Sequence, residues 1–160
     1  MKITNLKTIL LKTKKRCMYL DLSLFDTTDE SLDYLSTQIK DGNCIVVFKV
    51  NNISSKLALE FSFKIRQLTS LFSSLFLVED RFDICKLSNA DGVVLLNNSI
   101  DVKFAKKILD DDKLFAYFLS DEEQIDFLNY DFLILENKNL KKNVDKDIIY
   151  FTLENKNDNK

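Results

Sequence analysis

The stretch from Leu75 to Ile100, LFLVEDRFDICKLSNADGVVLLNNSI, decides the fold. Its apolar run at residues 75–78 has the length of a buried strand, and residues 82–87 form a helix-like segment. A second apolar run follows at residues 93–96. Strands that are apolar throughout and separated by helices are typical of a parallel sheet covered on both faces. The stretch therefore predicts a strand–helix–strand unit of an α/β protein.

The same alternation continues on both sides of this unit. Further strands are predicted at residues 18–24, 44–50, 114–119, 132–135 and 148–153, and helices at 29–40, from 54 or 55 onward, at 102–109 and at 121–128. Repeated units of this kind can close into a barrel or form an open doubly wound sheet, and periodicity does not choose between them. We expect one domain over residues 1–153 and a disordered polar tail at 154–160.

Charge and composition narrow the class of partner. The 160 residues carry a net charge of −2, and of the 23 basic residues only three are arginine, which gives no electrostatic basis for binding nucleic acid. No apolar run approaches the roughly 18 residues that a membrane span needs. The three widely separated cysteines are typical of buried, reduced thiols. These features predict a cytoplasmic protein with no nucleic-acid partner and no membrane partner.

Two absences limit the chemistry that the chain can perform. It contains no histidine, which removes the commonest general base and metal ligand. It contains two glycines and no proline, so a glycine-rich loop that cradles phosphate cannot be assembled.

The segments LVEDR at residues 77–81 and ADGV at residues 90–93 resemble the thiamine phosphate synthase / thiazole tautomerase family. In that family the third strand ends in Asn-Asp-Arg, and Ala-Asp-Gly-Val comes about ten residues later. The resemblance extends over about residues 17–136, with Ser120 and residues 129–132 in further matching positions. It implies an incomplete or degenerate (β/α)8 TIM barrel, because an eighth strand is not predicted.

The family couples a pyrimidine pyrophosphate to a thiazole phosphate and releases pyrophosphate. Its proteins supply mainly electrostatics, namely Mg²⁺ held by aspartates and cations around the pyrophosphate. Position by position, the resemblance implies catalytic roles for Lys49, Asp80 and Ser120, phosphate binding by Lys49, Asn51 and Arg81, and metal binding by Asp80.

The chain departs from the family pattern at several of these positions. The Gln, Arg and Lys of the family's second strand are Val47, Lys49 and Asn51, the corner Asn is Glu79, and the second metal aspartate is Ser99. A hydroxyl in place of a carboxylate removes a charge and a strong oxygen ligand of Mg²⁺. The tautomerase branch needs a catalytic histidine, which the chain lacks.

We therefore expect a thiamine phosphate synthase-like protein with weak or lost catalysis that retains binding of a phosphorylated small molecule or of a partner. The alternative is an active synthase with a site rebuilt from Lys49, Asp80, Arg81 and Ser120. Mg²⁺ is expected in the second case, and no cofactor in the first.

Simpler structural roles also fit the same residues. Residues 79–81 can be the acidic first turn of a helix, Ser120 a helix cap, Asp91-Gly92 a turn, and Lys49 a rim lysine.

A barrel that lacks an eighth strand would expose the edges of its first and last strands, at residues 18–24 and 148–153. We expect a homodimer to cover these edges. Pairing with a full-length homologue, or a fold-back of residues 3–11, would do the same.

Overall fold

The computed structural model describes residues 16–110, 112–121, 127–144 and 149–153. All seven expected strands are present: β1 (Arg16–Asp21), β2 (Cys44–Lys49), β3 (Leu75–Glu79), β4 (Gly92–Leu95), β5 (Leu114–Leu119), β6 (Phe132–Leu135) and β7 (Tyr150–Thr152). Every strand is parallel to the next, and their order in the sheet is their order in the chain. This topology is that of a barrel, since a doubly wound sheet reverses its strand order part-way.

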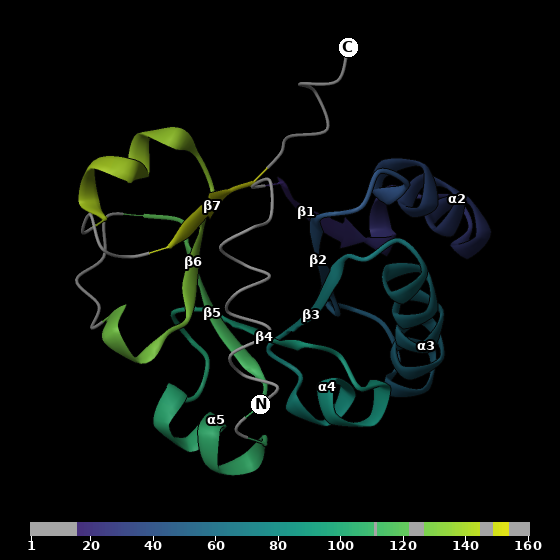
Figure 1. Ribbon diagram of the computed structural model, residues 1–160. Helices are drawn as coiled ribbons and strands as arrows, with labels where there is room; N and C mark the ends of the chain where they lie inside the picture. The colour runs from purple at the N-terminus through teal and green to yellow at the C-terminus, as the bar shows by residue number, and fades with distance from the viewer. Residues whose placement is uncertain (1–15, 111, 122–126, 145–148, 154–160) are drawn as a thin grey trace.

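Helices cover the outside of the strands. They are α2 (Thr28–Ile39), α3 (Ser55–Leu71), α4 (Phe82–Ser88) and α5 (Val102–Ile108), with the short 3-10 helices η1 (Leu22–Leu24), η2 (Phe127–Asn129) and η3 (Lys138–Asn143). The two longest begin at side-chain caps: Thr27 accepts the Glu30 N–H, and Ser54 accepts the Leu57 N–H. Figure 1 shows α2, α3 and α4 side by side along the outer face of β1 to β4.

The strands alternate between two cores. Residues that point into the barrel form one cluster: Cys17, Ile45, Val47, Leu75, Leu77, Val94, Leu114, Ala116, Phe132, Ile134 and Phe151, with Tyr19, Phe118 and Ile149 partly buried against it. The intervening residues of each strand pack outward against the helices. Each strand therefore has an interior face and a helix-covered face, which explains why its sequence is apolar throughout.

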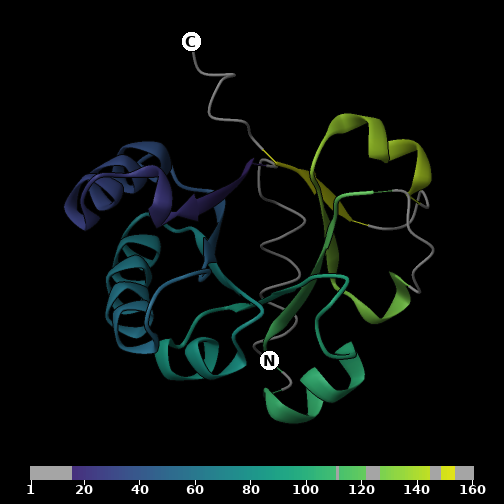
Figure 2. The ribbon, with the colours of Figure 1, turned by 180° about the vertical axis from the view of Figure 1, so that it is seen from behind.

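The first and last strands lie next to each other, and the sheet nearly closes. Cys17 and Leu153 form a parallel bridge, and Figure 2 shows the purple β1 beside the yellow β7. The open edges expected from the sequence are thus brought together, because strand tilt and twist curve seven strands almost into a ring.

The first strand differs from its predicted limits. It begins at Arg16 and ends at Asp21, and residues 22–24 form η1 instead of continuing the strand. The Asp21 carboxylate accepts the Ser23 N–H at 2.9 Å, which turns the chain away from the sheet. The predicted helix at 121–128 lies mainly outside the described residues, as do residues 3–11 and the tail at 154–160.

Two aspartates form hydrogen bonds with neighbouring strands at the amino ends of those strands. This end of the barrel is opposite the one at which the strands lead into the main helices. Asp91 accepts the Phe76 N–H at 2.8 Å and donates its own N–H to the Phe76 carbonyl at 2.7 Å. Asp131 makes the same reciprocal pair with Phe115, at 2.9 and 2.7 Å. Arg66 of α3 also pairs with the Asp91 carboxylate at 2.9 Å. The Ala-Asp-Gly motif is therefore part of the scaffold.

None of the helices in the described part of the chain is long and apolar enough to cross a membrane. Cys17, Cys44 and Cys85 are buried and form no disulfide, as their spacing predicted.

Candidate functional site

Three neighbouring strands each place a charged side chain at one level near the carboxyl end of the barrel. Asp21 of β1 lies opposite Lys49 of β2 in the strand register. Lys49 and Glu79 each follow directly on the Phe48–Val78 pair of β2 and β3. We call Asp21, Lys49 and Glu79, with Tyr19 one layer deeper, the mouth cluster.

The side chains of the mouth cluster point into the barrel. Asp21, Lys49 and Glu79 come two residues after Tyr19, Val47 and Leu77, which belong to the interior core. Since side chains two apart on a strand share a face, the charged layer lies directly above the apolar core. Active sites of (β/α) barrels are built at this carboxyl end.

The charges of the mouth cluster are unequally paired. Lys49 Nζ lies 3.8 Å from Asp21 Oδ2, with the two side chains 38% and 26% exposed. Glu79 is only 6% exposed, and the Lys49 ammonium is the cation that acts on its carboxylate. Burial raises the pKa of Glu79; the Lys49 ammonium lowers it, while the carboxylates of Asp80 and Asp21 raise it further. Glu79 is a buried acid held beside a single lysine.

Tyr19 adds a buried polar group that lacks a hydrogen-bond partner among the described residues. Its hydroxyl is buried and makes no hydrogen bond with the described part of the chain. Burial, and then the nearby Glu79 carboxylate, raise the pKa of Tyr19. Its ring packs edge-on against Phe118 with centroids 5.4 Å apart. A buried hydroxyl without a partner lowers the stability of the fold. A ligand that hydrogen-bonds to this hydroxyl would remove that cost.

Asp80 and Arg81 are not part of the mouth cluster. Asp80 is exposed and has a φ of 57°, a left-handed conformation that turns the chain from β3 toward α4. Arg81 donates two hydrogen bonds to Asp83, at 2.9 and 2.7 Å, and one to Ser55 Oγ at 3.2 Å. The hydrogen bond from Arg81 lowers the pKa of Asp83, and the hydrogen bond to Asp83 raises the pKa of Arg81. The side-chain hydrogen bonds of Arg81 thus go to Asp83 of α4 and Ser55 of α3.

Asn51 and Ser120 have different positions again. Asn51 is exposed and lines a pocket of about 260 Å³ between the loop after β1 and the loop after β2. Ser120 directly follows β5 and is half-buried, two residues after the interior Phe118. Of the residues proposed from sequence, Lys49 joins the mouth cluster, Ser120 lies on the same end of the barrel, and Asn51 belongs to the neighbouring pocket.

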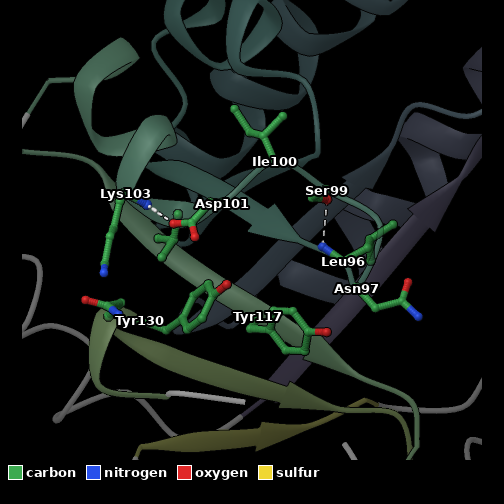
Figure 3. Close-up of a pocket in the computed structure, with 10 residues that line it drawn as sticks. Leu96, Asn97, Ser99, Ile100, Asp101, Lys103, Tyr117 and Tyr130 are labelled. Carbon is green, nitrogen blue, oxygen red and sulfur yellow. Dashed lines mark hydrogen bonds between the residues drawn. The ribbon is translucent and has the colours of Figure 1, made fainter. Parts of the chain in front are cut away.

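A larger pocket, of about 430 Å³, lies on the outer wall of the barrel between the loop after β4, the start of α5, the strand β5 and η2. Figure 3 shows the rings of Tyr117 and Tyr130 along it, with centroids 5.2 Å apart. Tyr117 belongs to the outward-facing core, so this pocket is separate from the barrel mouth. Burial and then Asp101 raise the pKa of Tyr130.

Ser99, which occupies the position of the family's second metal aspartate, lines this outer pocket, and its hydroxyl accepts the Leu96 N–H at 2.8 Å.

The described residues contain no group of three or more histidines, cysteines, aspartates or glutamates that could hold a metal ion. Asp80 is the remaining candidate, and one exposed carboxylate is a poor match for the Mg²⁺ site that the family implies. The protein alone thus supplies fewer oxygen ligands than the family pattern, and bound phosphates would have to complete the coordination of the ion.

The sequence reasoning missed Tyr19 and Asp21. Both come from β1, at alternate positions of a strand that is otherwise apolar in its interior. A polar residue at every second position near the carboxyl end of a barrel strand is the signal that could have identified them.

Comparison with known proteins connects this geometry to a family. A family profile described as "Thiamine monophosphate synthase" matches residues 22–130. Thiamine-phosphate synthases from Campylobacter jejuni (strain 81-176) and Persephonella marina are 30% and 32% identical over 116 and 102 residues. These alignments cover 68% and 59% of this chain but 55% and 49% of the relatives. The chain thus spans about half the length of the relatives that it matches.

The fold has a solved counterpart. The structure titled thiamine phosphate pyrophosphorylase from Pyrococcus furiosus superposes with a TM-score of 0.75 at 21% sequence identity, covering 93% of this chain and 77% of that one. This likeness supports the barrel fold, with the mouth cluster at the end where such barrels bind ligands.

Proposed function

The chain belongs to the thiamine monophosphate synthase family, and on that basis we propose that it is a member with weak or lost synthase activity that binds a phosphorylated ligand at the barrel mouth. The proposed place of action is the cytoplasm. The ligand would be held mainly by Lys49, whose ammonium is partly exposed at the carboxyl end of the barrel.

One observation carries this proposal: the mouth cluster balances one lysine with two carboxylates. The family reaction releases pyrophosphate, and a protein that assists it has to stabilise negative charge as the leaving group departs. Here Asp21 lies 3.8 Å from Lys49, Glu79 is buried beside it, and Arg81 is paired with Asp83. Such a site can hold a phosphate weakly but is poorly equipped to stabilise a departing pyrophosphate.

The rival proposal is an active synthase that uses Asp80, Arg81, Lys49 and Ser120. It is supported by the exposed Asp80 carboxylate, which stands at the carboxyl end of β3. In that case Asp80 would contribute to binding the metal ion, and the substrate phosphates would have to supply most of the remaining ligands.

The test is a turnover assay with the purified protein, the pyrimidine pyrophosphate, the thiazole phosphate and Mg²⁺. We expect no thiamine phosphate at rates approaching about 1 s⁻¹, the low end of ordinary enzyme turnover. Turnover at or above that rate would refute the proposal. Slow turnover that the substitution Asp80→Asn abolishes would establish the rival, since asparagine tolerates the left-handed backbone of residue 80 and removes only the charge.

A further inference from the structure

We propose that Glu79 determines the ligand selectivity of the barrel mouth by acting as an internal counter-charge to Lys49, so that the site discriminates against pyrophosphate. This inference rests on the proposed function and deepens it, because it names the class of ligand that the site admits. Because the effect comes from the negative charge of Glu79, pyrophosphate should bind more tightly when this one carboxylate is made neutral.

The position of Glu79 sets its carboxylate beside the charge of Lys49. It stands on β3 at the level of Lys49 on β2, on the interior face, with Asp21 on the far side of the lysine. The charges therefore run negative, positive, negative across three adjacent strands. An anion that approaches Lys49 meets one attractive and two repulsive charges at the same level.

Burial strengthens the repulsion from Glu79 in particular. Asp21 is partly solvated, with 26% of its side chain exposed, whereas Glu79 is 6% exposed as a residue. Charges are screened least where water is excluded, so Glu79 acts on a bound anion more strongly than an exposed acid would. The effect grows with the charge of the ligand, and a pyrophosphate is disfavoured more than a single phosphate.

Glu79 is also not explained by the stability of the fold. Its carboxylate is largely buried beside Lys49, and the buried Tyr19 hydroxyl near it lacks a hydrogen-bond partner in the described part of the chain. A buried charge and a buried phenol that lacks a hydrogen bond both cost folding free energy. A ligand that presents a hydrogen-bond donor to Glu79 and carries no more than one phosphate would satisfy both this carboxylate and Lys49.

The experiment is calorimetric titration of pyrophosphate and of inorganic phosphate at neutral pH and low salt, without added Mg²⁺. The proteins compared are the unaltered chain, Glu79→Gln, Lys49→Ala with Glu79→Gln, and Glu136→Gln. Glu136 provides the matched control, because it is an exposed acid that directly follows β6 at the same end of the barrel. We expect Glu79→Gln to bind pyrophosphate about tenfold tighter or more, with a smaller gain for phosphate. The control should stay within about twofold of the unaltered chain.

The other outcomes decide between the proposed role of Glu79 and the proposed residual binding of phosphate. Equal pyrophosphate affinity of Glu79→Gln and the unaltered chain would overturn the inference, as would an equal gain in the control or a gain that survives the loss of Lys49. If the unaltered chain fails to bind phosphate while Glu79→Gln gains pyrophosphate binding, the inference stands and the proposed residual binding fails. Circular dichroism and the melting temperature confirm folding, and Glu79→Asn serves as the second neutral variant should the glutamine variant not fold.

Discussion

Lys49 and Arg81 are both cations near the carboxyl ends of neighbouring strands, but the structure gives them different surroundings. Lys49 faces the barrel mouth, whereas Arg81 is held by Asp83 and Ser55 outside it. We expect about 10 mM phosphate to raise the melting temperature by roughly 3–6 °C if the dissociation constant is near 1 mM. Lys49→Ala should abolish this shift and Arg81→Ala should preserve it, as measured by thermal unfolding with and without phosphate.

Loss of the shift in Arg81→Ala, with retention in Lys49→Ala, would reverse the roles given to these residues. The sequence predicted that both cations lie at strand ends. Because adjacent side chains on a strand face opposite sides, it also predicted that Glu79 and Asp80 point in different directions. It could not assign a partner to Arg81, because the choice between a phosphate and Asp83 depends on the turn at Asp80, whose left-handed backbone is not encoded by any local pattern.

At the scale of elements, the amino end of β4 depends on the absence of a side chain at residue 92. Gly92 lies opposite Leu114 in the register of β4 and β5, and a Cβ atom there would lie 2.2 Å from the Leu114 carbonyl oxygen. We expect Gly92→Ala to lower the free energy of unfolding by about 3 kcal/mol or to prevent folding, since the two strands must separate. Urea unfolding followed by circular dichroism measures this, because the chain has no tryptophan.

The other glycine provides the comparison. Gly42 has a φ of 74°, and its Cβ would lie 3.0 Å from the Phe72 carbonyl oxygen, so Gly42→Ala should cost about 1–2 kcal/mol. A larger loss at residue 42 than at residue 92 would contradict this account of the β4–β5 contact.

Element positions were largely predictable from the sequence. The apolar runs gave the seven strands, and the Ala-Asp-Gly motif indicated both the family and the β3–β4 unit. The structure shows that Asp91 and Gly92 serve the scaffold, through Phe76, Arg66 and Leu114. The composition of the mouth cluster could not be predicted, because it joins three strands whose relative register the sequence does not specify.

At the scale of the whole molecule, the seam between β1 and β7 is the weakest part of the ring. In the described part of the chain, one bridge joins this seam, between Cys17 of β1 and Leu153, which directly follows β7. Strand edges that are poorly paired favour association with another chain, and we propose that two copies pair along this seam. Light scattering at micromolar concentration should give about twice the chain mass of 18.7 kDa.

A mass of one chain at every concentration would instead favour closure within the chain, by residues 3–11. Deleting residues 1–12 should then unfold or aggregate the protein. If the deleted protein remains a folded monomer, neither way of covering the seam is correct.

The order of the strands also has a consequence for how the chain folds. Each strand pairs with the one that follows it in sequence, so every contact between neighbours closes a short loop, and assembly can proceed from the first unit as synthesis continues. The bridge from Cys17 to Leu153 is the exception, because it closes a loop of almost the whole chain. The entropy lost in closing a loop rises with its length, so this bridge is the last contact to form and the first to open. The nascent protein would pass through a stage in which its strands are paired in a curved, unclosed sheet, and the rate of ring closure would determine how long that sheet is exposed to other chains.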